Sequence, residues 1–237
     1  MKKVVKIIVL CVVVFVVFIG VLVGKDLLME KKLEKEIDSV YDLINKDKVD
    51  TKEVNKKLDR TVTTGEYKKI EKALKNYLKD VITTTDTLTS LLNDEKMTEV
   101  LSIENIKKDQ KEFKESLAYL KETKDSLSSS FNQLKSLLEK DTMLSYFKKE
   151  KIDASYKEEY EELVQEEQEE LKATQKELKT ALEQINTLLD AEEKILILLK
   201  ENPNSWKITN GQIEFYEQKL LDKYNSYYDE IAKISEE

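Results

Sequence analysis

The chain has 237 residues and a formal net charge of −8, with only four glycines and one proline. So few turn-forming residues exclude a β-sandwich or β-barrel, while the abundance of Lys, Glu, Asp and Leu is typical of long helices with charged outer faces. A hydrophobic content of 40% is enough for a packed core. Arg60 is the sole arginine. An acidic chain without clustered arginines matches phosphate backbones poorly, so we expect no nucleic-acid partner.

An unbroken apolar run from Ile7 to Val23 lies near the start of the chain, and Val4 to Gly24 is predicted to be a transmembrane anchor. A cleaved signal peptide is the alternative. Such peptides have shorter apolar regions that end in small residues, and this run does not end that way. The lysines at positions 2, 3 and 6 predict a cytoplasmic N-terminus. We therefore expect a signal-anchor, a single pass through the cell membrane and an extracellular C-terminal domain.

Cys11, the only cysteine, lies inside the apolar run, where a membrane-buried structural role is expected. Without a second cysteine the chain forms no intrachain disulfide, so packing alone must hold the extracytoplasmic domain. Gly20 and Gly24 are spaced as in the G-x-x-x-G motif, which lets two membrane helices approach closely. A homodimer is therefore one alternative to a monomer.

The segment after the anchor shows the spacing of amphipathic helices. Residues 26–50 carry Leu33, Ile37, Tyr41 and Ile44 at steps of four and three, which predicts that the anchor helix continues as a stalk. A short helix from Thr51 to Arg60 follows. Thr63 and Glu66 are spaced as a capping box and predict the start of a helix that reaches Leu92. The Thr83-Thr84-Thr85 run is its least favourable part, because β-branched residues lose rotamer freedom in helices.

Two later segments have apolar residues seven apart, as in coiled coils. A helix is predicted from Ile103 to Leu138, with a short connecting helix from Asp141 to Lys149 after it. A second capping box at Ser155 and Glu158 predicts a helix that ends before Asn202-Pro203, and a final helix completes the chain. The two seven-residue series are Phe113, Leu120, Leu127 and Leu134, and Val164, Leu171, Leu178 and Ile185.

Residues 206–215 carry the one non-helical signal in the chain. Apolar and polar residues alternate around Asn210-Gly211, the preferred type I′ hairpin turn. A two-residue loop would pair Ile208 with Ile213 and Trp206 with Phe215. We predict a small β-hairpin here; the alternative is an earlier start of the last helix, near Ile213.

Together these patterns predict an all-α fold: an elongated, antiparallel, coiled-coil-like helical bundle with one N-terminal transmembrane helix and a small β-hairpin near the C-terminus. The predicted domains are residues 1–25 as cytoplasmic lysines and anchor, 26–50 as a helical stalk, and 51–237 as one extracytoplasmic bundle containing the hairpin 206–215.

The residue inventory argues against catalysis. The chain has no histidine, which removes the commonest general base and most zinc sites. Its glycines form no phosphate-binding loop, and no acidic loop has the spacing of an EF-hand. A carboxylate pair could still act as a glycosidase pair, but this needs a cleft that a narrow bundle offers little room for. We predict no enzyme, no catalytic residues, no cofactor and no metal.

Three features are candidates for an interaction surface. The first is the aromatic end of the chain, whose composition resembles interface hot spots. The second is Arg60, whose fork could hold a carboxylate or phosphate, although an ordinary surface ion pair is the simpler interpretation. The third is the acidic run from Glu158 to Glu170, more simply a solvated helix face. The candidate interaction residues are Trp206, Phe215, Tyr216, Tyr228 and Arg60.

Three strings resemble motifs in an uncharacterised family of N-terminally membrane-anchored, all-helical extracytoplasmic proteins of low-GC Gram-positive bacteria. They are Arg60-Thr-Val-Thr-Thr-Gly-Glu-Tyr67, Leu91-Leu-Asn-Asp-Glu-Lys96, and Ser205-Trp206 through Ile213-Glu-Phe215 to Lys223-Tyr-Asn225. The resemblance covers nearly the whole domain in the same order. It implies location and architecture, and it carries over no catalytic residues.

The leading functional hypothesis is a non-enzymatic, membrane-anchored interaction or scaffold protein of the cell envelope with an unknown protein partner. A binding module for a cell-wall polymer or small ligand is the first alternative, with Trp206, Phe215 and the tyrosines as stacking surfaces. An immunity-type protein that blocks a toxin at the membrane is the second. The exposure of Trp206 to solvent distinguishes the ligand-binding hypothesis from the scaffold hypothesis. A buried Trp206 would remove the main support of the ligand-binding hypothesis.

Overall fold

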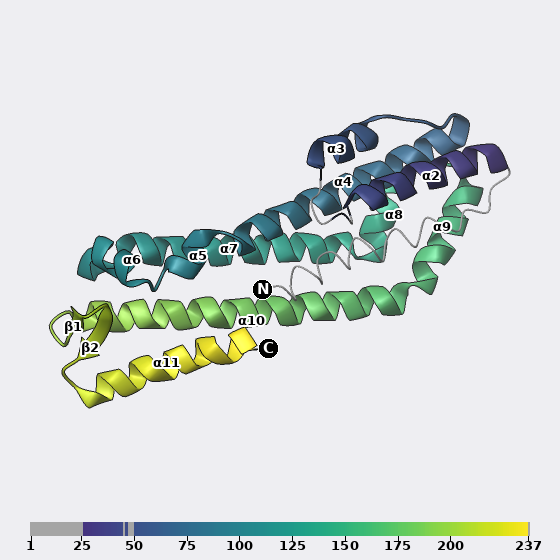
Figure 1. Ribbon diagram of the computed structural model, residues 1–237. Helices are drawn as coiled ribbons and strands as arrows, with labels where there is room; N and C mark the ends of the chain where they lie inside the picture. The colour runs from purple at the N-terminus through teal and green to yellow at the C-terminus, as the bar shows by residue number, and fades with distance from the viewer. Residues whose placement is uncertain (1–25, 45, 47–49, 237) are drawn as a thin grey trace. The chain divides into compact units, whose positions relative to one another are not determined.

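The computed structural model describes residues 26–44, 46 and 50–236, which are almost entirely helical apart from one two-stranded sheet (Figure 1). The predicted helical class and the predicted hairpin are both confirmed. The predicted anchor, Val4 to Gly24, lies outside the described residues. Within the described residues, no helix is long and apolar enough to cross a membrane.

The helices and strands follow one another with short connections. In the first half they are α2 (Leu27–Ile44), α3 (Thr51–Asp59), α4 (Gly65–Leu92), α5 (Glu95–Glu99), α6 (Ile103–Lys108) and the 3-10 helix η1 (Gln110–Glu112). In the second half they are α7 (Lys114–Leu137), α8 (Lys140–Lys149), α9 (Ala154–Glu166), α10 (Gln168–Glu201), β1 (Trp206–Thr209), β2 (Gln212–Phe215) and α11 (Gln218–Glu236).

The described residues form two compact units. Unit 1 comprises residues 88–131 and 179–236, and unit 2 comprises residues 26–87 and 132–178. Each unit therefore brings together segments that are distant in the sequence.

Unit 2 contains α2, which was predicted to be a stalk continuous with the anchor. The Asp26 carboxylate caps the first turn of α2, because it accepts from the backbone N–H groups of Leu28 and Met29 at 3.1 and 3.3 Å. One face of α2 is fully buried, with Leu33 and Ile37 both 0% exposed. Residues 27–44 are thus an integral part of the packed unit.

Aromatic and polar contacts join α4 to the helices of unit 2 that come later in the chain. Tyr77 and Tyr146 pack edge to face with ring centroids 5.4 Å apart. The Tyr77 hydroxyl donates to the Leu137 carbonyl at 2.9 Å, and the Tyr146 hydroxyl donates to Asp80 at 2.5 Å. These tyrosines are buried with their hydroxyls satisfied, so they belong to the core.

Unit 1 is organised around residues 114–131 of α7 and residues 179–201 of α10. Lys124 of α7 makes ion pairs with Asp190 and Glu193 of α10, each at 2.5 Å. The hairpin follows α10, and Figure 1 shows α11 (yellow) lying alongside α10 (green), where Lys194 and Glu230 form an ion pair at 3.1 Å. This arrangement places β1 and β2 at one end of the unit.

The hairpin has the predicted register. Trp206 pairs with Phe215 and Ile208 with Ile213 in antiparallel strands. Asn210 and Gly211 have φ values of 51° and 76°, both positive as a type I′ turn requires.

Both predicted capping boxes are wrong. Thr63 is instead held by Glu71, and α4 begins at Gly65 with a φ of 62°. Glu66 pairs with Lys69. At the second site Asp153, rather than Ser155, provides the cap by accepting from the Ser155 N–H at 3.0 Å.

Two helices predicted to be continuous are interrupted. The segment 103–138 is divided by η1 and by Phe113, whose φ of 50° lies in the left-handed region. The segment after Ser155 ends as α9 at Glu166, and α10 starts at Gln168. The threonine run, by contrast, stays helical within α4, where the Thr84 hydroxyl donates to the Asp80 carbonyl four residues earlier.

Candidate functional site

Trp206 is a wall residue at the hairpin end of unit 1. Its side chain is only 6% exposed, and its indole N–H donates to the Leu199 carbonyl at 2.9 Å. The ring lies 6.3 Å from that of Phe113, which is fully buried. Trp206 therefore has a packing role with a satisfied donor and presents no open stacking face.

A groove of about 550 Å³ adjoins Trp206, and we call it the hairpin groove. Its polar and aromatic lining comes from α6, η1, the segment before β1, and the hairpin and its end. The lining includes Lys107, Gln110, Lys111, Trp206, Lys207 and Tyr216, and no acidic residue. The charged side chains of this lining are all lysines, although the chain has a net charge of −8.

The three lysines of the hairpin groove are held differently. Lys111 lies 5.2 Å from the centroid of the Trp206 ring and donates to the Pro203 carbonyl. Lys207 pairs with Glu214 on the opposite strand at 3.2 Å. Lys107 is exposed on α6. The groove thus has two anchored cations and one projecting cation.

Two further features mark the hairpin groove. Tyr216 is 63% exposed, the Lys207 ammonium lies 5.9 Å from the centroid of its ring, and its backbone N–H donates to the Ser205 carbonyl at 3.0 Å. Gln110 has a φ of 55°, a conformation that a non-glycine residue adopts at a cost. The groove therefore combines an exposed aromatic ring with a fixed, strained segment of backbone.

Phe215 and Tyr228 lie in a different aromatic cluster from Tyr216. Phe215 packs against Tyr224 with centroids 5.1 Å apart, and Tyr224 packs against Tyr228 at 4.8 Å. Burial and a hydrogen bond with Tyr228 raise the pKa of Tyr224 well above its usual value. The aromatic residues near the C-terminus therefore form two separate clusters. Trp206 and Tyr216 line the hairpin groove, whereas Phe215 and Tyr228 pack with Tyr224.

Arg60 lies in unit 2, and its side chain is engaged within the chain. The guanidinium donates to both carboxylate oxygens of Glu36, at 2.7 and 2.5 Å, while Glu36 is only 5% exposed. The ion-pair interpretation holds in a stronger form than expected, since a bidentate fork grips a buried carboxylate. Because its guanidinium is bound to Glu36, Arg60 has a structural role.

Glu36 belongs to a buried charge network that sequence reasoning missed. Lys75, 3% exposed, donates to Glu36 at 2.9 Å and pairs with Glu71 at 2.7 Å. Its ammonium also donates to the carbonyls of Lys57 and Arg60, at 2.7 and 2.9 Å. Burial favours the neutral acid, but hydrogen bonds from Arg60 and Lys75 outweigh it and lower the pKa of Glu36 to about 2.

Glu71 completes the network, and it binds the Thr63 segment in place of the predicted capping box of Thr63 and Glu66. It is 0% exposed and accepts from the backbone N–H groups of Val62 and Thr63 and from the Thr63 hydroxyl. Every charge in the network has an opposite charge or a hydrogen bond, as a buried cluster requires. The network joins α2, the α3–α4 connection and α4, so its role is architectural.

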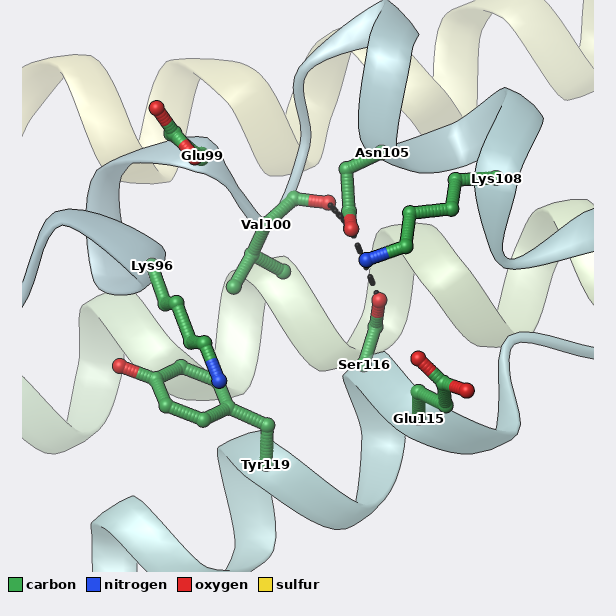
Figure 2. Close-up of a pocket in the computed structure, with 8 residues that line it drawn as sticks. All are labelled: Lys96, Glu99, Val100, Asn105, Lys108, Glu115, Ser116 and Tyr119. Atoms are coloured by element: carbon green, nitrogen blue, oxygen red, sulfur yellow. Dashed lines mark hydrogen bonds between the residues drawn. The ribbon is translucent and has the colours of Figure 1, made fainter.

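A second, smaller pocket of unit 1 lies between α5, α6 and the start of α7 (Figure 2). Its volume is about 180 Å³. Asn105 donates to the Val100 carbonyl and to the Ser116 hydroxyl, both at 2.8 Å, and these groups hold the connection together. Lysines and glutamates both line it, and Lys96 lies over the ring of Tyr119. Its mixed charges define no particular ligand.

Glu192 of α10 is a buried acid in unit 1. Its side chain is 7% exposed, and its Oε2 has no hydrogen-bond partner among the described residues. Burial raises its pKa to about 7. The sequence held a signal for this position, because extending the series Val164, Leu171, Leu178 and Ile185 by seven residues reaches Glu192, in register with the apolar seam.

The acidic run from Glu158 to Glu170 lies on α9 and the start of α10. Its glutamates line an open depression with Lys140, which donates to Gln165 at 2.8 Å, while Tyr160 and Val164 are buried on the opposite face. Within residues 26–44, 46 and 50–236, no group of three or more His, Cys, Asp or Glu is placed to hold a metal ion. The run has the pattern of a solvated face.

No family model matches the chain, and neither a curated protein nor a solved structure shows significant similarity to it. The hairpin groove is consequently defined by its own residues and by its geometry.

Proposed function

We propose that the protein is a non-enzymatic, membrane-anchored interaction protein of the cell envelope, whose helical units stand outside the cytoplasm. The apolar run from Ile7 to Val23, with lysines before it and none of the charges that interrupt the later helices, supports the anchor and the orientation. The resemblance to membrane-anchored helical proteins of Gram-positive bacteria agrees with this placement.

The hairpin groove is the observation that carries the interaction role. It brings an exposed tyrosine, a tryptophan wall and three lysines together at the end of unit 1. Interfaces use aromatic side chains as anchors, because such rings bury a large area at a small entropic cost. Arg60, Tyr77 and Tyr146 of unit 2, by comparison, are committed to internal contacts.

Site-directed cross-linking in intact cells tests this proposal. A photo-reactive phenylalanine derivative replaces Tyr216 in one variant and Lys121, an 80% exposed residue of α7, in the matched control. We expect a reproducible envelope partner to be captured through position 216 and not through position 121, identified by mass spectrometry after purification through a C-terminal tag.

The other outcomes each have a definite meaning. Capture of the same neighbours from both positions, or of none, would contradict an interaction role for the groove. Capture of the protein alone through position 216 would replace the adaptor proposal with self-association, the homodimer alternative that Gly20 and Gly24 also permit.

A further inference from the structure

We propose that unit 2 docks on the outer surface of the lipid bilayer, with Leu27 and Leu28 inserted at the boundary between headgroups and acyl chains. The inference rests on the proposed function, since it requires the apolar run from Ile7 to Val23 to cross the membrane. It adds an interaction surface at the start of α2, and the partner of that surface is lipid.

Leu27 and Leu28 form an exposed apolar pair in the first turn of α2. Their side chains are 70% and 62% exposed, and within residues 26–44, 46 and 50–236 no other leucine is comparably exposed. Single exposed apolar residues are ordinary on protein surfaces. An adjacent pair directly after an apolar run indicates instead a surface that is covered in the protein's working environment.

The place of the pair in the chain identifies what covers it. Leu27 is four residues beyond Val23, where the apolar run ends. Four residues span about 14 Å when fully extended and about 6 Å in a helix. The headgroup layer on each side of a bilayer is roughly 5–8 Å thick. A chain that leaves the membrane at Val23 therefore keeps the leucine pair close to the lipid, into whose boundary apolar side chains insert favourably.

Three segments of unit 2 meet at the end that carries this pair. Figure 1 shows the starts of α2, α4 and α9 at the same end of the unit. The Thr64 hydroxyl, just before α4, donates to the sulfur of Met29 at 3.6 Å. The rings of Tyr67 and Tyr156 pack edge to face with centroids 5.7 Å apart. Because these contacts join the three helix starts, a bilayer that holds the leucines also lies close to the start of α4.

The charges at this end are compatible with a lipid surface. Lys31, Lys32 and Lys68 are exposed, and lysine side chains can extend their ammonium groups to lipid headgroups. The acidic run from Glu158 to Glu170, however, begins about one turn after the start of α9. This end of the unit therefore does not select anionic lipid by its charge, and the leucines carry the attachment.

Lipid quenching of a fluorophore on Lys68→Cys tests whether the start of α4 lies on the bilayer. The full-length protein, with Cys11→Ser to remove its only native thiol, is reconstituted into phosphatidylcholine vesicles that contain lipid spin-labelled near the headgroup. A membrane-impermeant maleimide fluorophore labels the outward-facing copies alone. Position 68 is far from Val23 in the sequence, so chain connection does not impose its proximity to the membrane. We expect strong quenching at this position.

Lys56→Cys is the matched control, because Lys56 is also an exposed lysine of a unit 2 helix. Its neighbour Lys57 donates to the Ser39 hydroxyl at 2.7 Å, so position 56 lies near Ser39. Ser39 is about 18 Å beyond Leu27 along the axis of α2. Collisional quenching requires contact with the spin label, and we therefore expect much weaker quenching at position 56.

A matched pair of double variants, each combined with Lys68→Cys, tests whether the leucines carry the attachment. Leu27→Ser with Leu28→Ser removes the apolar pair. Lys31→Ser with Lys32→Ser removes two exposed charges from the next turn of α2. We expect the leucine variant to lower the ratio of docked to undocked protein on the order of tenfold, and the lysine variant to change it by less than about threefold. An unchanged circular dichroism spectrum confirms that both variants remain folded.

The results that overturn the inference are distinct from those that overturn the proposed function. Equal quenching at positions 68 and 56, or none at position 68, would overturn the docking of unit 2 and leave the anchor in place. Equal loss of quenching in the two double variants would overturn the insertion of the leucines. Extraction of the full-length protein from the vesicles by alkaline carbonate would remove the membrane anchor, and with it both the proposed function and this inference.

Discussion

At the scale of single residues, polar groups interrupt the apolar seams in two different ways. Lys124 of α7 lies seven residues after Leu117 and seven before Phe131, and it pairs with two acids of α10, Asp190 and Glu193. Glu192, one residue away from Glu193, is buried and has an unsatisfied oxygen. A buried carboxylate without a partner destabilises a fold in its charged form, so Glu192 makes the stability of unit 1 depend on pH.

We predict that Glu192→Gln removes a fall in stability between about pH 4.5 and pH 7. Burial raises the folded-state pKa of Glu192 from 4.5 to about 7, so the folded state binds more protons than the unfolded state in this window. Its contribution is therefore fully present below the unfolded pKa and lost as pH rises through the folded pKa. The shift corresponds to about 3 kcal/mol, and denaturant unfolding at pH 5 and pH 8 measures it.

Glu193→Gln is the matched control for this prediction. It changes the neighbouring residue on α10 and removes one of the two partly buried ion pairs of Lys124, which keeps Asp190 as a partner. The pH dependence of the control should match that of the wild type. If Glu192→Gln and Glu193→Gln alter the pH dependence equally, the burial of Glu192 is not its source.

At the scale of elements, the hairpin depends on its turn. Gly211 has a φ of 76°, and a Cβ placed there would meet nothing within 4 Å. Substitution by alanine is therefore costly through backbone conformation alone. We predict that Gly211→Ala lowers the free energy of unfolding by about 1 kcal/mol. It should also shift the emission of Trp206, because β1 begins at that residue.

Gly65→Ala provides the comparison for the hairpin variant. Gly65 has a φ of 62° and the same open surroundings, but it begins α4 in unit 2. Its stability loss should be similar in size, while the Trp206 emission of its folded state stays unchanged. A shift of that emission by both variants would show that the tryptophan does not report on the hairpin locally.

Local patterns predicted the elements whose structure is determined locally. The Asn210-Gly211 turn carries its own backbone preference, and the strand pairing follows from it. The seven-residue series identified buried positions correctly, since Phe113, Leu120, Leu127 and Leu134 are all 0% exposed. Burial requires only a consistent apolar face, which periodicity reveals.

The elements that were predicted wrongly are determined by contacts between residues that lie apart in the sequence. Thr63 and Glu66 have capping-box spacing, but Glu71, stabilised by Lys75, accepts the hydrogen bonds of the Thr63 segment. Phe113 keeps its buried position while its backbone leaves the helix. A periodic pattern constrains which side chains are buried and leaves the continuity of the backbone undetermined.

The candidate site was partly predictable for the same reason. Composition drew attention to Trp206 and Tyr216, which line the groove. It gave no indication of Lys107 and Lys111, because those lysines belong to another part of the chain and resemble other helical surface lysines. The cationic character of the groove arises from tertiary structure, which brings α6, η1 and the hairpin together.

At the scale of the whole molecule, the uneven distribution of charge along the sequence predicts its orientation. Positively charged residues precede the apolar run, and the units that follow carry the acidic surplus. Lysines beside a membrane segment are retained in the cytoplasm. Both units should consequently face the outside of the cell, where the hairpin groove would meet other components of the envelope.

Cysteine labelling in intact cells tests this orientation, because Cys11→Ser removes the only native thiol. In that background, Lys56→Cys reports on unit 2 and Lys121→Cys on unit 1, at positions that are 71% and 80% exposed. A membrane-impermeant maleimide should label both in intact cells, whereas Lys2→Cys should react only after the membrane is permeabilised. Labelling of Lys2→Cys alone in intact cells would reverse the orientation. The hairpin groove would then face the cytoplasm, and extracytoplasmic envelope components would no longer be available as its partners.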